Sequence, residues 1–432
     1  MPGQPEHPPA GPRRPYRTAL LVVAVTAAGF NLRAAITSLP PLFPDLAAQL
    51  HLSPGLLSLL AATPVICFGV FSGFAAWLNR RFGEEIVLLA ALGVLTAGLL
   101  LRGAVPGVML FPGTALAASA IAILNVLLAS MVKRRSPERA GLLIGIYLTA
   151  LSVGAIIASL ISVPLYHASG GSVRLALGVW AAPAALAVLL WLPQLRHRVR
   201  RRPGDAAAGA SSASVSAGDP APIATKVYKR ALTWQVTAFM GLQSLLYYAA
   251  LSWLPTIFQD RGTSAVTAGN LLALMGVGNL IGAPLAPVIA HRLPGQRSLV
   301  VPSMVAMAAG LAGSLWAPLG MAPFWVLVLG LGQGACLGLA IFFTMARAPD
   351  PATAASLGAF AQSVGYLLSS AGPLELGLLH SATGSWTIPV VLLLALCGCA
   401  LAFGVLAARP LTLPGRQTAT HVSVTGQAQR AV

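Results

Sequence analysis

The sequence carries very little charge for its length. Only 9% of its 432 residues are Asp, Glu, Lys or Arg, and 56% are hydrophobic. A soluble globular chain carries about a quarter charged residues, so this chain could not cover a water-soluble fold with polar surface. The composition therefore excludes an ordinary soluble protein and indicates one that crosses a membrane many times.

Acidic residues, cysteine and histidine are also scarce, at ten, four and seven. The cysteines, Cys67, Cys336, Cys397 and Cys399, lie in apolar stretches and show no disulfide or metal-site spacing. The three lysines lie in no glycine-rich phosphate loop. We therefore predict that the protein is not an enzyme, has no catalytic residues, and binds neither a metal nor a cofactor.

Twelve apolar segments fill most of the chain, and each has the length of a transmembrane helix. They cover residues 18–44, 55–78, 86–103, 107–132, 140–166, 174–194, 231–258, 267–290, 298–318, 321–346, 355–380 and 386–408. A basic, Ala/Ser/Gly/Pro-rich linker at 196–230 divides them six and six. We predict an all-α membrane protein with two six-helix bundles, 18–195 and 231–408, and disordered tails at 1–17 and 409–432.

The basic residues give the chain a net charge of +17, and their placement predicts its orientation. If the N-terminus is inside, 23 of the 27 Lys and Arg residues fall in inner segments, and only Arg102, Arg174 and Arg261 fall outside. Such an asymmetry follows the positive-inside rule, so both termini are predicted to be cytoplasmic. Short basic clusters between apolar runs suit anionic lipid and not nucleic acid. We expect a multi-pass monomer in the cell membrane, with no nucleic-acid partner.

The remaining basic residue, Arg33, lies inside the first apolar segment. A guanidinium that faces lipid costs several kcal/mol and cannot lose its proton. Arg33 must therefore face a polar cavity or a buried partner. Two interpretations stay open: an anion site within the helix bundle, or a structural arginine that caps carbonyl groups.

The two halves of the sequence resemble each other at three places, separated by 212 to 215 residues. The matching pairs are Leu39–Asp45 with Leu254–Asp260, Arg80–Gly83 with Arg292–Gly295, and Arg135–Glu138 with Arg347–Asp350. Duplicated six-helix halves are typical of alternating-access transporters, whose substrate site lies between the halves near the membrane midplane.

Several motifs resemble the major facilitator superfamily, and within it the cyanate and 2-nitroimidazole transporter subfamily. The first is Gly73–Gly83, although Asn79 replaces the usual acidic residue of that loop. The others are Asn31–Pro40, Asn125 with Val132–Pro137, Gly241–Tyr248 with Trp253–Pro255, Gly332–Gly334, Gln362–Tyr366, Gly372-Pro373, and His380 with Gly384–Trp386. The resemblance implies a twelve-helix carrier whose central cavity is lined by helices 1, 4, 7 and 10 and their neighbours.

The polar residues of those helices are the candidate substrate site. Gly29, Arg33 and Thr37 share one face of the first helix, and Tyr248 occupies the repeat position of Arg33. The full candidate set is Arg33, Asn31, Asn125, Tyr147, Gln243, Tyr247, Tyr248, Asn279, Gln333, Gln362 and Tyr366. One cation among neutral amides and phenols suits a small monoanion or a planar polar molecule. For each neutral residue, helix–helix packing is the alternative.

Proton coupling has one candidate, Glu375, the acidic residue that lies clearly within an apolar segment. We predict a secondary active transporter of a small-molecule or small-anion substrate. The alternatives are an efflux carrier of the same fold with an unrelated substrate and a membrane sensor that does not transport.

Overall fold

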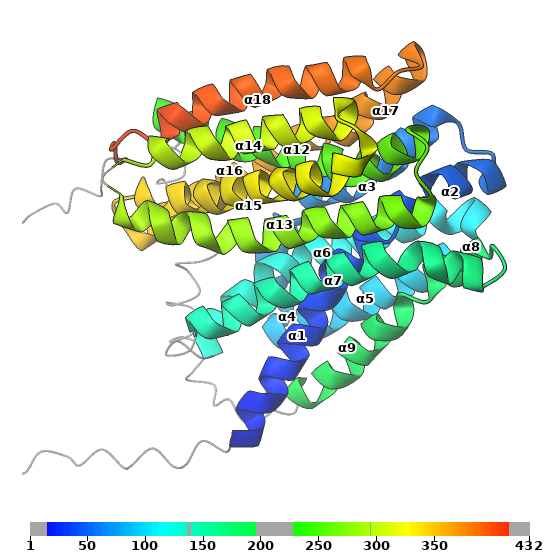
Figure 1. The fold of residues 1–432 in the computed structure, drawn as a ribbon. Coiled ribbons are helices and arrows are strands. Elements are labelled where there is room, and N and C mark those ends of the chain that lie inside the picture. The colour runs from blue at the N-terminus through cyan, green and yellow to red at the C-terminus, as the bar shows by residue number, and fades with distance from the viewer. Residues whose placement is uncertain (1–14, 136–139, 196–227, 294, 414–432) are drawn as a thin grey trace, which may run out of the picture.

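The computed structural model describes residues 15–135, 140–195, 228–293 and 295–413, and its regular elements there are all helices (Figure 1). The predicted tails and linker lie outside the described residues for 1–14, 196–227 and 414–432. The prediction of an all-α membrane protein is confirmed. Within the described ranges, ten helical stretches are long and apolar enough to cross a bilayer.

The N-terminal half holds the first six predicted segments, some of them in two pieces. Its elements are α1 (Pro15–Thr37), η1 (Pro40–Leu42), α2 (Phe43–Leu50), α3 (Pro54–Phe71), α4 (Phe74–Phe82), α5 (Glu84–Ala104), α6 (Pro106–Arg135), α7 (Ala140–Ala168), α8 (Val173–Gly178) and α9 (Ala181–Leu195).

The C-terminal half holds the last six predicted segments. Its elements are α12 (Ala231–Asp260), α13 (Ala265–Arg292), α14 (Arg297–Trp316), η4 (Leu319–Met321), α15 (Ala322–Ala346), α16 (Pro351–Ser369), α17 (Ala371–Thr383) and α18 (Thr387–Ala407). In Figure 1, this half lies above the N-terminal half, and α13 runs beside α7 along the boundary.

Two predicted segments are not among the ten apolar spans, namely α12 and the α16–α17 pair. Gln243, Tyr247 and Tyr248 lie on α12, and Gln362 and Tyr366 lie on α16. These polar side chains lower the hydropathy of their helices, which are nevertheless packed among the apolar spans. Both of these helices thus carry polar residues that were predicted for the site.

Prolines and small residues break three of the predicted segments. Pro40 and Pro41 end α1 and start η1, because proline cannot continue the helical hydrogen-bond ladder. The segment predicted at 55–78 ends at Phe71, and α4 begins after a turn. The segment predicted at 355–380 is interrupted after Ser369, shortly before Pro373.

Small residues bring helices together within each half. A Cβ atom on Gly98 of α5 would lie 2.7 Å from the backbone nitrogen of Ala117 on α6. A Cβ atom on Gly278 of α13 would lie 2.6 Å from the Leu327 carbonyl oxygen on α15. Close backbone contact of this kind is how membrane helices gain packing energy where lipid removes the hydrophobic drive.

The two halves contact each other through α7 with α13 and through α3 with α16 and α17. At the end of the molecule that holds η1, Gln259 of α12 donates a hydrogen bond to the Pro41 carbonyl at 3.4 Å. Phe43 packs on Trp253 there, with ring centroids 5.7 Å apart. The halves are therefore closed against each other at the η1 end.

Candidate functional site

A small cavity of about 20 Å³ lies between the halves, and six of the predicted site residues line it. Its lining residues come from α1, α12, α15 and α16: Arg33, Gln243, Ser244, Tyr247, Tyr248, Gln333, Leu337 and Tyr366. A space of this size holds about one water molecule. In this conformation the lining side chains therefore lie close to one another, and a solute would have to displace them.

Arg33 reaches the cavity from α1 and crosses to the other half. Its Nη1 donates a hydrogen bond of 2.5 Å to the hydroxyl oxygen of Tyr247. The guanidinium carbon lies 5.1 Å from the ring centre of Tyr247 and 5.9 Å from that of Tyr248, close enough for cation–π attraction. The partner is a phenol and not a main-chain carbonyl, so this hydrogen bond does not make Arg33 a helix cap.

The remainder of the predicted face of α1 packs against α7. A Cβ atom on Gly29 would lie 3.0 Å from the Tyr147 side chain. Thr37 donates from Oγ1 to the carbonyls of Arg33 at 3.0 Å and of Ala155 at 3.2 Å. Contacts with α7 on both sides of Arg33 thus fix the helix that carries the cation.

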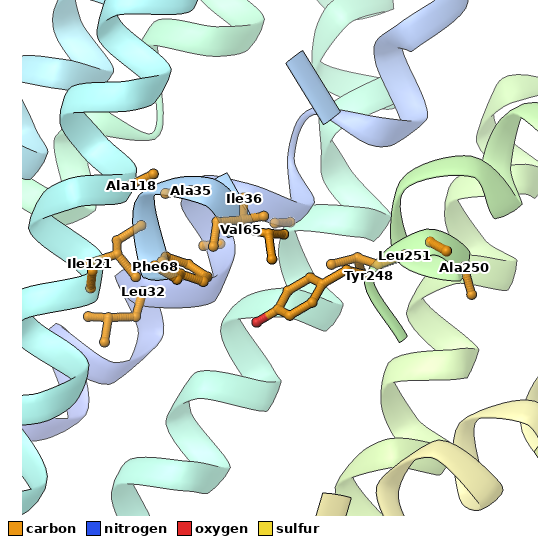
Figure 2. Close-up of a cluster of buried hydrophobic side chains, with 14 of the residues drawn as sticks. Leu32, Ala35, Ile36, Val65, Phe68, Ala118, Ile121, Tyr248, Ala250 and Leu251 are labelled. Carbon is orange, nitrogen blue, oxygen red and sulfur yellow. The ribbon is translucent and has the colours of Figure 1, made fainter. Parts of the chain in front are cut away.

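Aromatic rings form one wall of the cavity. Tyr248 packs edge-on against Tyr366 and Phe68, with ring centroids 6.3 Å apart in each pair. Phe68 also contacts Tyr366, at 6.0 Å. Figure 2 shows Tyr248 and Phe68 beside the buried apolar side chains Leu32 and Val65. This packing holds the phenol rings at fixed positions beside Arg33.

The two glutamines of the cavity differ in their hydrogen bonds. Gln243 is buried, and its Nε2 donates to the Met240 carbonyl at 3.1 Å and to Ser244 Oγ at 2.7 Å. Gln333 is only 1% exposed, and neither Oε1 nor Nε2 has a hydrogen-bond partner. Gln243 thus has its donor group occupied, whereas Gln333 has both groups available.

Five of the predicted substrate-site residues lie outside the cavity lining, and four of them lie between helices of the bundle. Asn31 donates from Nδ2 to the Ala27 carbonyl at 2.8 Å and to the Pro183 carbonyl at 3.0 Å, which joins α1 to α9. Tyr147 donates to Asn125 Oδ1 at 2.8 Å, between α7 and α6. Asn279 lies on α13, and its buried Nδ2 has no partner among the described residues. The contacts of Asn31 and of Tyr147 with Asn125 hold helices together, which is the alternative that the sequence left open.

Gln362 and Glu375 are both exposed and line no part of this cavity. Gln362 lies one turn before Tyr366 on α16, and Glu375 lies on α17. Within the described ranges, the buried carboxyl groups are instead those of Glu84 and Glu85 at the start of α5, and neither was predicted to be functional. Glu84 accepts a hydrogen bond from Ser130 at 3.1 Å. This hydrogen bond joins α5 to α6.

Ser244 and Leu337 also line the cavity, and neither is among the residues predicted for the site. Ser244 follows Gln243 directly, and Leu337 lies one turn after Gln333, so helical periodicity could have identified both. Among the lining residues of this cavity there is one cation and no carboxylate. The site therefore offers a permanent positive charge, phenols for stacking or hydrogen bonding, and neutral amides.

Comparisons with known proteins agree with this architecture. The sequence profile described as "Major Facilitator Superfamily" matches residues 19–373. A Bacillus subtilis (strain 168) protein named "Uncharacterized transporter YycB" is 37% identical over 376 residues, 87% of this chain and 90% of its own. From Escherichia coli (strain K12), a "2-nitroimidazole transporter" is 33% identical, covering 86% and 91%, and "Cyanate transport protein CynX" is 29% identical, covering 85% and 91%.

Solved structures share the fold at low sequence identity. A bacterial homologue of the human lysosomal transporter Spinster, in an inward-facing, unoccupied conformation, gives a TM-score of 0.72 at 17% identity, covering 92% of this chain and 98% of that one. The D-xylose–proton symporter gives 0.71 at 15% identity, covering 92% and 100%. The helix arrangement of Figure 1 is thus one that known carriers adopt.

Proposed function

Because this chain belongs to the major facilitator superfamily, it is a secondary transporter, and we propose that Arg33 anchors a small anionic or planar polar substrate in its central cavity. The observation that carries the proposal is the Arg33 guanidinium beside a cavity whose lining contains no carboxylate. A cation held away from bulk water without a counter-ion attracts an anion or a hydrogen-bond acceptor.

The walls of the cavity support a flat or small substrate. Tyr247, Tyr248 and Tyr366 present ring faces and edges, and Arg33 itself can stack on a planar group. A dianion such as phosphate would more often meet several cations. The relatives named for 2-nitroimidazole and for cyanate agree with a planar heterocycle or a small monoanion as the substrate class.

The proposed cycle uses the boundary between the halves. The cavity takes residues from α1 of one half and from α12, α15 and α16 of the other. Rocking of the halves would therefore expose Arg33 to one side of the membrane at a time. From the distribution of basic residues, we propose that both termini are cytoplasmic and that the η1 end faces outward.

Replacement of Arg33 tests the proposal. In a thermal-shift screen against small anions and azoles, the purified wild-type protein should be stabilised by at least one class, and Arg33→Gln should lose that response. A hydrogen bond to a charged group contributes about 1.5–3 kcal/mol, so affinity should fall by roughly 10- to 100-fold. Arg33→Lys should not restore it fully, because ammonium lacks the planar fork of donors.

The matched control is Arg174→Gln. Arg174 is exposed and donates from Nε to the Ala104 carbonyl at 2.8 Å, outside the cavity. This variant should keep both ligand response and transport in proteoliposomes. Wild-type affinity in correctly inserted Arg33→Gln would refute the anchor role.

A further inference from the structure

Gln333 presents a buried primary amide to the cavity with both of its polar atoms unpaired. The side chain is 1% exposed, and neither Oε1 nor Nε2 finds a partner among the residues that the structure describes. Buried amides are nearly always hydrogen-bonded, so a cavity residue that lacks both bonds is one that a ligand or water must satisfy.

Two polar groups of the cavity already have hydrogen-bond partners other than Gln333. The Gln243 amide nitrogen donates to Met240 and Ser244, and the Tyr247 hydroxyl accepts from Arg33. Gln333 also comes from α15, whereas Arg33 comes from α1. The cavity therefore combines a cationic group on one helix with a vacant donor–acceptor pair on another.

We propose that Gln333 determines specificity by pairing with an adjacent donor and acceptor on the edge of the substrate, while Arg33 holds an anionic or acceptor group elsewhere on the same molecule. This inference rests on the proposed function of the cavity. The substrate class is a small planar solute with a hydrogen-bond donor and acceptor side by side in its plane, as in an azole or amide edge. A linear anion without a donor leaves the Gln333 carbonyl unpaired.

A pair of closely matched probes separates these chemistries. Pyrazole-4-carboxylate has a carboxylate at one end and adjacent N–H and N atoms at the other, and its 1-methyl derivative lacks only the donor and gains a methyl group. Binding of each to the purified full chain is measured by calorimetry. The wild-type protein should prefer the N–H compound by about tenfold or more, because the methylated compound leaves a buried acceptor unpaired.

Gln333→Met, which keeps the length of the side chain without its amide, should reduce this preference to about one. Its ligand-free melting temperature should equal or exceed that of the wild type, because an unsatisfied buried amide has been removed. Gln333→Leu provides a second apolar variant if the first does not fold. A lower melting temperature in both variants, or an unchanged preference, would overturn the inference.

The matched control is Asn279→Leu, because Asn279 Nδ2 is also buried and unpaired but does not line the cavity. This variant should bind both probes as the wild type does. Arg33→Gln distinguishes the two proposals. If Arg33→Gln binds neither probe and the wild type shows no preference between them, only the role of Gln333 is refuted. If Arg33→Gln binds both probes as tightly as the wild type does, the proposed function of the cavity is refuted.

Discussion

Arg33 and Arg102 are both held within the helix bundle, but their partners differ. Arg102 is 1% exposed and donates to the Ala35 carbonyl at 2.8 Å and to Ser38 Oγ at 3.3 Å, at the end of α1. Arg33 donates to a phenol beside a cavity. The sequence predicted Arg102 to lie on the outer side, in a loop or at a helix end, and it lies near the end of α5. There it performs the capping role that was considered for Arg33. Burial alone therefore does not identify an arginine that binds substrate. The group that accepts its hydrogen bond is more informative.

Tyr247→Phe tests whether the hydroxyl partner of Arg33 contributes to binding. The change removes the 2.5 Å hydrogen bond and leaves the ring in place. We expect the KM for transport to rise about tenfold, because Arg33 loses a group that fixes its orientation. Initial rates of uptake into proteoliposomes across a substrate series measure this change.

The control for this prediction is Tyr147→Phe. Its hydroxyl donates to Asn125 between α7 and α6 and does not line the cavity. Tyr147→Phe should lower the melting temperature of the protein and leave the KM for transport nearly unchanged. A larger KM effect from Tyr147→Phe than from Tyr247→Phe would contradict the assignment of Tyr247 to the site.

Helical periodicity predicted some residue positions and failed at others for identifiable reasons. Tyr248, the repeat counterpart of Arg33, lies beside it, with the ring centre 5.9 Å from the guanidinium carbon. The repeat did not point to Tyr247, which accepts the hydrogen bond from Arg33. Gln362 and Tyr366 share a helix face, yet only Tyr366 reaches the cavity, because a shared face does not fix depth along the helix. Asn31 lies two residues from Arg33 and so points to another side of α1, where it meets Pro183. Only the packing of neighbouring helices determines these outcomes.

At the scale of the helix, arginine side chains close several C-terminal ends. Arg174 donates to the last carbonyl of α5, and Arg347 donates from Nε to the last carbonyl of α18 at 2.9 Å. Arg261 donates from Nη1 to the Ser314 carbonyl at 2.5 Å and from Nη2 to that of Ala317, at the end of α14. A cation at a helix C-terminus pairs orphan carbonyls and complements the helix dipole. Arginines outside the cavity thus stabilise the helix ends.

Gly278→Ala tests the close packing of α13 on α15. The added Cβ would lie 2.6 Å from the Leu327 carbonyl oxygen and 2.7 Å from the Leu331 backbone nitrogen. Because both are main-chain atoms, the helices must separate, at a cost of about 1–3 kcal/mol. The melting temperature of the purified protein should fall accordingly.

Gly398→Ala on α18 is the control for this packing prediction. Apart from the neighbouring residues of its own helix, no atom lies within 4 Å of the added Cβ. Alanine is also more favourable than glycine within a helix, by up to about 1 kcal/mol. Its melting temperature should stay constant or rise. If Gly278→Ala behaves in the same way, close contact between α13 and α15 does not stabilise this fold.

The apolar pattern predicted the membrane helices more accurately than their interruptions. Apolar length and basic clusters indicate where a helix crosses the bilayer. The breaks after Phe71 and Ser369 do not change that pattern, because apolar residues continue across them. At the second break, Pro373 uses its carbonyl to accept a hydrogen bond from Trp253 Nε1 at 2.7 Å. A long-range contact of this kind leaves no signature in local periodicity.

For the whole molecule, the η1 end is closed by contacts between the halves. Besides Phe43 on Trp253, α3 lies against α17, where a Cβ atom on Gly55 would lie 3.8 Å from Leu378 Cδ2. Near the same end, Asp260 accepts a hydrogen bond from Trp386 Nε1 at 2.7 Å, and its Oδ2 lies 3.7 Å from His380 Nε2. The contacts of Phe43 with Trp253 and of α3 with α17 join the two halves and must separate when the proposed cycle exposes Arg33 to that side. The contacts of Asp260 lie within the C-terminal half and can persist.

Gly55→Cys with Leu378→Cys tests that requirement. The four natural cysteines are first replaced by serine or alanine, so that crosslinking reports only the new pair. A short bifunctional thiol reagent should join the two cysteines in the ligand-free protein, because Gly55 and Leu378 are in contact there and Leu378 is 44% exposed. Uptake into proteoliposomes should then stop, while ligand binding from the opposite side persists. If the reagent attaches to the cysteines through disulfide bonds, reduction should restore uptake.

Each single-cysteine variant, treated identically, should transport normally. Full transport by the crosslinked protein would mean that α3 and α17 need not separate, and a rocking motion of the two halves could not be the transport mechanism.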